Sequence, residues 1–142
     1  MISTIDLPDV NVWLALTNPD HAFHARAVQY WNEEMHVGGI AFCRITMLGF
    51  LRLMTNAKAM ADKPFGHQEA WEIYGTYRGL PEVRFLIEAP DIETRFTTLD
   101  FPQRMWTDAY LAAFVLTAGC RIVSFDRDFS RFNEVELLLL EN

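Results

Sequence analysis

The sequence has few cysteines, few basic residues and no long apolar run, and each shortage argues against a class of protein. Its two cysteines and four histidines show no zinc-ligand spacing, which argues against a zinc site and favours buried free thiols in a reducing cytoplasm. No stretch approaches the roughly 18 unbroken apolar residues of a membrane span, so we expect no membrane association. The N-terminus carries acids where a signal peptide would carry a basic segment.

The charge balance is acidic. There are 12 lysines and arginines against 19 aspartates and glutamates, which gives a formal net charge of −7. This balance argues against nucleic-acid binding by bulk charge, but it permits a nuclease whose acids gather around metal ions. An acidic chain also suits a basic partner segment. The 51% share of hydrophobic residues is ample for a core, and we expect residues 1–142 to form one domain.

Short apolar segments alternate with helical patterns along the chain. Strands that are separated by helices, and too apolar to face solvent on one side, predict an α/β fold with a parallel sheet covered on both faces. The pattern predicts strands at residues 2–7, 40–43, 83–87, 122–125 and 136–140, and helices at residues 9–16, 21–36, 46–55, 67–77, 91–99 and 107–118.

The stretch from Thr107 to Asp128 holds a helix, a break, a strand and a pair of acids. Thr107 is predicted to cap the helix, with Asp108 in its first turn, where the helix dipole favours a carboxylate. Gly119 is placed to end the helix. Asp126 and Asp128 follow the strand, at the edge of a parallel sheet where ligands bind.

Asp9 occupies a strand-to-helix turn at the same predicted edge, so separate elements bring several carboxylates together. Crowded carboxylates hold their protons more tightly unless a cation intervenes. Magnesium and manganese prefer oxygen ligands, and such ions promote the hydrolysis of phosphodiesters. Asn11 is placed to orient a carboxylate or to bind an ion through water. Taken singly, each acid also fits an ordinary role as a helix cap, a dipole partner or a turn residue.

Four sequence blocks resemble those of PIN-domain ribonucleases, and most of all the VapC-type toxins of toxin–antitoxin pairs. They are DVNVWLAL at residues 9–16, TMLGFLR at 46–52, TDAYLAA at 107–113 and SFDRDF at 124–129. The resemblance covers nearly the whole chain. It implies a three-layer α/β/α sandwich with a mostly parallel sheet of about five strands.

The resemblance also implies a function and a set of site residues. It implies endonucleolytic cleavage of RNA that depends on Mg²⁺ or Mn²⁺, neutralisation by a cognate antitoxin, and a homodimer. We infer a dimer contact through the helices at residues 46–55 and 67–79. Carried over by position, the metal-binding acids are Asp9, Asp108 and Asp126, with Asp128 nearby as a further catalytic residue, and Asn11 and Thr46 line the site.

Two other residues of the second block bear on function. Arg52 is placed for a phosphate contact, with a surface ion pair as the alternative. Gly49 stands where many PIN domains carry a glutamate, so either Asp128 replaces that acid or the site binds one ion through fewer protein ligands.

Two rival interpretations follow from the sequence. The absence of that glutamate motivates a degenerate PIN fold that binds RNA or a protein without cleavage. A phosphotransfer enzyme with Asp9 as nucleophile is the other. Against it, the chain has no Asp-x-Asp start and no obvious lysine at a strand end.

Overall fold

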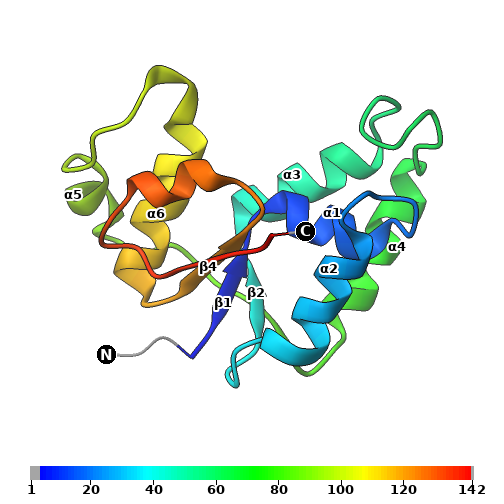
Figure 1. Ribbon diagram of the computed structural model, residues 1–142, viewed down its shortest axis with the longest axis horizontal. Coiled ribbons are helices and arrows are strands. Elements are labelled where there is room, and N and C mark those ends of the chain that lie inside the picture. Colours follow the sequence, from blue (N-terminus) through cyan, green and yellow to red (C-terminus); the bar gives the residue numbers. More distant parts are fainter. Residues whose placement is uncertain (1–3, 142) are drawn as a thin grey trace.

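A five-stranded sheet forms the middle layer of the computed structural model, which describes residues 4–141 (Figure 1). The strand order is β3-β2-β1-β4-β5, and all four pairings are parallel. The strands are β1 (Asp6–Pro8), β2 (Ile40–Phe42), β3 (Val83–Phe85), β4 (Arg121–Ser124) and β5 (Leu137–Leu139). The predicted parallel α/β fold is therefore confirmed, while residues 2–3 of the first predicted strand lie outside the described residues.

Helices cover both faces of this sheet, with α5 and α6 on one side and α1 to α4 on the other (Figure 1). The α-helices are α1 (Val10–Thr17), α2 (His24–Gln29), α3 (Arg44–Met54), α4 (His67–Arg78), α5 (Ile92–Phe96) and α6 (Trp106–Ala118). A short π-helix, η1 (Tyr30–Glu34), extends α2, and there are two short 3-10 helices, η2 (Gln103–Met105) and η3 (Arg127–Arg131). Within residues 4–141, none of these helices has both the length and the apolar character needed to cross a bilayer.

Alternation along the strands divides the core in two. In β4, Ile122 packs with the α6 side and Val123 with the α1 side, and both are almost fully buried. Cys43 and Cys120 are buried free thiols in the layer beside α6, as the sequence predicted. Alternating side chains thus give the sheet two apolar faces, which the two helical layers bury.

Two helices begin earlier than the sequence predicted. Helix α6 begins at Trp106, so Thr107 lies inside it, because the preceding 3-10 turn already brings the backbone into a helical path. Helix α3 begins at Arg44, and Thr46 lies in its first turn. Gly119 ends α6 with a φ of 74°, which is the left-handed conformation that glycine adopts most readily.

A buried ion pair ties the sheet together at the edge where β1 and β4 begin. Asp6 is fully buried and accepts hydrogen bonds from Arg121 Nε at 2.9 Å and Nη2 at 3.0 Å. The Tyr30 hydroxyl donates to the same carboxylate at 2.6 Å. The contacts between Asp6 and Arg121 join β1 to β4. The hydrogen bond from Tyr30 joins this pair of strands to η1.

The order of the strands reverses between β1 and β4. From β1 the chain continues through β2 to β3 on one side, whereas β4 and β5 lie on the other. The loops that leave β1 and β4 therefore turn toward opposite faces, and the crevice between them is where open α/β sheets bind ligands.

Candidate functional site

Asp9 and Asp126 occupy corresponding places just after the two central strands. Asp9 caps α1, and its carboxylate accepts a hydrogen bond from the backbone amide of Val10 at 2.7 Å. Asp126 caps η3 in the same manner and accepts from the amide of Asp128 at 2.9 Å. Ser124 links them, because its hydroxyl donates to Asp9 at 3.1 Å and accepts from the amide of Asp126 at 2.9 Å.

Asp108 completes the group from the first turn of α6. One carboxylate oxygen from each of Asp108, Asp126 and Asp128 lies within 4.8 Å of the others. Two oxygens that bind one magnesium ion at about 2.1 Å are at most about 4.2 Å apart, so small side-chain movements would let all three bind it. The chemistry and spacing of these donors therefore fit a hard divalent cation.

Two carboxyl groups of the site, those of Asp108 and Asp9, have raised pKa values. Burial raises the pKa of Asp108, and the charges of Asp9, Asp126 and Asp128 raise it further, to about 6. Arg104 acts in the opposite direction on the pKa of Asp108. Burial also raises the pKa of Asp9, although its hydrogen bonds oppose this effect. A cation among these carboxylates would relieve their repulsion.

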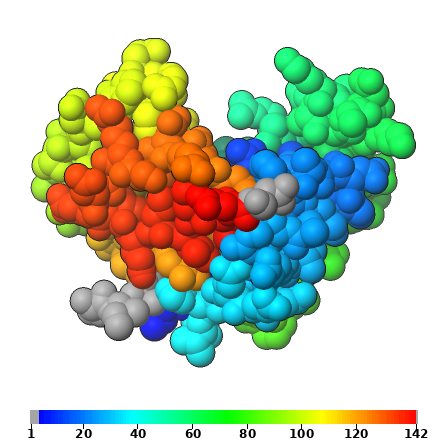
Figure 2. All heavy atoms as spheres, in the orientation of Figure 1, coloured from blue at the N-terminus to red at the C-terminus, as the bar shows by residue number. Residues whose placement is uncertain are grey.

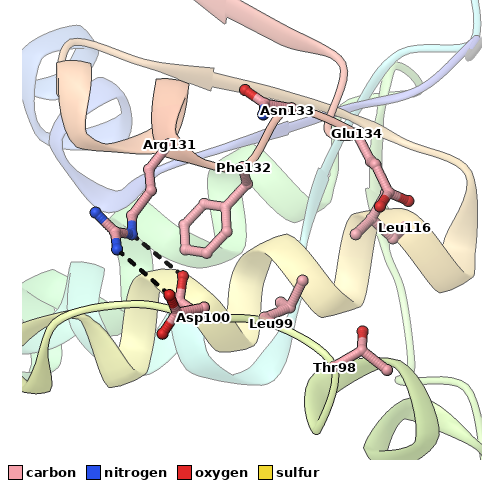
Figure 3. Close-up of a pocket in the computed structure, with 8 residues that line it drawn as sticks. All are labelled: Thr98, Leu99, Asp100, Leu116, Arg131, Phe132, Asn133 and Glu134. Atoms are coloured by element: carbon pink, nitrogen blue, oxygen red, sulfur yellow. Dashed lines mark hydrogen bonds and ion pairs between the residues drawn. The ribbon is translucent and has the colours of Figure 1, made fainter.

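A hollow in the surface leads to this edge of the sheet. It opens between the orange and yellow surface of residues 97–131 and the cyan-green surface of α3 and residues 55–66 (Figure 2). The blue surface at the start of α1 is visible at its floor (Figure 2). A separate cavity of about 300 Å³ lies elsewhere, between α6 and the segment after η3 (Figure 3). Its lining, which includes Leu99, Asp100 and Phe132, contains none of the clustered acids.

The sequence also predicted three polar residues at the site, and the structure shows where each of them lies. Asn11 is exposed in the first turn of α1. Thr46 is fully buried, and its hydroxyl accepts from the amide of Cys43 at 3.0 Å and is 3.1 Å from the carbonyl of that residue. Arg52 lines a groove between α3 and α4 together with Trp71. Contact of these residues with a substrate stays a prediction.

Gly49, the departure from the family pattern, lies where α3 meets α1. A Cβ atom at this position would be 2.8 Å from Cγ2 of Val10. That distance is too short for a normal contact, so the glycine permits the close approach of the two helices. The structure gives Gly49 a packing role and provides no space for a larger side chain without movement of Val10.

Sequence reasoning missed Ser124 and Arg104. Ser124 is fully buried and connects two of the acids, and Arg104 donates to Asp128 at 3.2 Å. The position of Ser124 at the end of a buried strand, and as the first residue of the SFDRDF block, was the available signal. Nothing in the local pattern around Arg104 indicated an ion pair with a residue 24 positions away.

The fold and the site together define a class: parallel α/β proteins with clustered carboxylates at the switch point of the sheet. A family model described as the PIN domain matches residues 7–135. The ribonuclease VapC41 of Mycobacterium tuberculosis is 35% identical over 94% of this chain and 97% of its own length. The ribonuclease VapC38 of the same organism is 32% identical over 84% of each chain.

Solved structures agree on the fold. The crystal structure of M. tuberculosis VapC20, described as a sarcin-ricin loop cleaving toxin, superposes with a TM-score of 0.61 at 19% identity, covering 88% of this chain and 92% of the other. FitAcB from Neisseria gonorrhoeae gives 0.61 at 17% identity, covering 94% and 96%. The chain belongs to the PIN-domain family, among its VapC-type ribonucleases.

Proposed function

We propose that this chain is a metal-dependent endoribonuclease and the toxin of a type II toxin–antitoxin pair. The observation that carries the proposal is the group of carboxylates from Asp108, Asp126 and Asp128, which lie within 4.8 Å of one another beside Asp9. Ribonuclease relatives that align over nearly the whole chain support RNA as the substrate class.

Each residue of the site has its own role in the proposed reaction. Asp9, Asp108 and Asp126 hold a Mg²⁺ or Mn²⁺ ion, and Asp128 supplies the carboxylate that Gly49 does not. Bound there, such an ion neutralises charge on a phosphodiester and makes water a better nucleophile. Ser124 orients the carboxylate of Asp9 and the backbone of Asp126 through its two hydrogen bonds.

A cleavage assay tests the proposal. We expect the wild-type protein to cut single-stranded RNA with millimolar Mg²⁺ or Mn²⁺ and to be inactive with EDTA. Asp108→Asn should reduce the rate by at least about a hundredfold, as loss of a charge-stabilising group in an active site typically does. Asp20→Asn, on an exposed turn, makes the same change in charge and should cleave normally. Cleavage by Asp108→Asn at the wild-type rate would show that the site is assigned wrongly.

A second candidate is a PIN fold that binds RNA or protein without cleavage. The packing of Gly49 against Val10 favours it, because the place of the family's glutamate is filled by a helix contact. Calorimetry separates the two functions. An inactive PIN protein should bind no Mg²⁺ in the millimolar range, whereas the nuclease should show saturable binding that Asp126→Asn weakens.

We further propose a homodimer and a protein antitoxin. Leu48 on α3 and Trp71 on α4 are large apolar residues, 55% and 56% exposed, on the helices where a dimer contact was predicted. A dimeric mass by light scattering, reduced to the monomer in Trp71→Glu, is the expected result.

The net charge of −7 suits a basic antitoxin segment. A short upstream reading frame that suppresses the growth defect of cells expressing this chain would identify that partner.

A further inference from the structure

Arg104 stands at the rim of the acidic group without being part of its predicted machinery. It belongs to the 3-10 turn η2, directly before the helix that carries Asp108. Its guanidinium donates to Asp128 at 3.2 Å. The side chains of this ion pair are 63% and 41% exposed. An arginine therefore already contacts one of the carboxylates that are placed to bind a cation.

This ion pair is too exposed to be an important part of the fold. Exposed pairs of this kind contribute at most about 1 kcal/mol to stability. The two arginines near Asp128 in the sequence have partners outside the acidic group: Arg127 donates to Glu141 at 3.0 Å, and Arg131 to the carbonyl of Asp100 at 3.1 Å. Among these three arginines, Arg104 is the one that pairs with the acidic group.

The backbone around Arg104 is fixed, although its side chain is exposed. Arg131 holds Asp100 through its carbonyl oxygen and approaches the carboxylate at 3.9 Å (Figure 3). Phe101 packs edge-on against Trp106 with ring centroids 4.9 Å apart, and Met105 is buried. Anchors on both sides of Arg104 thus keep its Cα beside the acids while its guanidinium is able to change partner.

We infer that Arg104 is an exchangeable counter-ion of the site, which pairs with Asp128 in the metal-free protein and with an RNA phosphate when a divalent ion is bound. The inference rests on the proposed function. A divalent ion carries twice the charge of a guanidinium and repels it at short range, so the two compete for Asp128. Released, the planar guanidinium matches the geometry of a phosphate, which it binds through paired hydrogen bonds.

The first arm of the test measures metal binding without RNA. Mn²⁺ is titrated calorimetrically into the wild-type protein, Arg104→Ala and Arg104→Lys. Removal of the competing cation should tighten Mn²⁺ binding by Arg104→Ala roughly two- to fivefold, which is the range that an exposed ion pair supports. Lysine keeps the charge, so Arg104→Lys should bind Mn²⁺ with wild-type affinity.

The second arm measures RNA binding in the presence of Mn²⁺. A fluorescent single-stranded RNA with phosphorothioate linkages, which resist hydrolysis and keep their charge, is bound by the wild-type chain and by Arg104→Ala. We expect affinity to fall about tenfold and the slope of log affinity against log salt to shrink by about 0.7, as for the loss of one phosphate contact. Arg84→Ala is the matched control, because Arg84 is exposed and its Nε donates to the carbonyl of Gly38 at the opposite edge of the sheet.

Opposite effects on the two ligands are the signature of exchange. Unchanged or weaker Mn²⁺ binding by Arg104→Ala would overturn the inference, and so would a loss of RNA affinity no greater than that of Arg84→Ala. If the wild-type chain bound no RNA, the proposed function and the phosphate contact would both fail. The metal titration would then still decide, separately, whether Arg104 competes for Asp128.

Discussion

Replacement of Asp108 by asparagine should abolish cleavage and yet stabilise the metal-free protein. Asparagine keeps the shape of the side chain and removes a charge that the fold disfavours. The pKa of Asp108 is raised from 3.8 to about 6, first by burial and then by the charges of Asp9, Asp126 and Asp128. Ionisation of this carboxylate therefore lowers the free energy of unfolding.

The pKa of Asp108 determines the size of this destabilisation and the pH range in which it acts. The unfolded chain loses the Asp108 proton at a lower pH than the folded chain, so the destabilisation is absent below about pH 4 and complete above about pH 6. The difference between the two pKa values corresponds to about 3 kcal/mol, and because the side chain is partly exposed, solvent screening reduces this to about 1–2 kcal/mol. For a domain of this size the variant should melt about 3–6 °C higher.

Thermal unfolding followed by circular dichroism, in EDTA across this pH range, measures the effect. Asp108→Asn should exceed the wild type in melting temperature at neutral pH and should match it at about pH 4. Millimolar Mg²⁺ should narrow the neutral-pH gap, because the ion stabilises the wild type alone. A variant that melts at or below the wild-type temperature at neutral pH in EDTA would refute the reasoning that clustered charge strains this edge of the sheet.

Three further substitutions probe the packing and support of the site. Gly49→Ala should be less stable than Gly75→Ala by about 1–3 kcal/mol in urea denaturation, because a methyl group at Gly49 meets α1 while one at Gly75 meets nothing within 4 Å. Arg121→Ala should lose about 3–5 kcal/mol of stability by the same method, because it leaves the buried carboxylate of Asp6 without its cation. Ser124→Ala should fold normally but bind Mn²⁺ about tenfold more weakly in calorimetry, and equal binding would remove Ser124 from the site.

The sequence contained enough information to predict the elements and the edge where the acids gather. Strand and helix patterns are local, so they revealed five apolar strands and the acids that follow two of them. Asp9 lies directly after β1 and Asp126 lies two residues after the end of β4, and parallel strands bring such positions together whatever their separation in sequence. The convergence of Asp9 and Asp126 was therefore a consequence of fold class.

What the sequence did not contain was the pairing of individual side chains. The hydrogen bond from Ser124 to Asp9 and the ion pair of Arg121 with Asp6 each join residues 115 positions apart. Both depend on the register of β1 against β4, which is fixed by packing of the whole sheet. The start of α6 depended likewise on the preceding 3-10 turn, which a local preference for a threonine cap did not predict.

The central claim is that the carboxylates of Asp9, Asp108, Asp126 and Asp128 hold one divalent ion at the switch point of the sheet. Crystals soaked in Mn²⁺ and measured at a wavelength where manganese scatters anomalously test this directly. The account predicts one strong anomalous peak about 2.1–2.3 Å from oxygens of these carboxylates, and its loss in Asp126→Asn crystals. A peak elsewhere on the molecule, or none here in saturating Mn²⁺, would contradict the account.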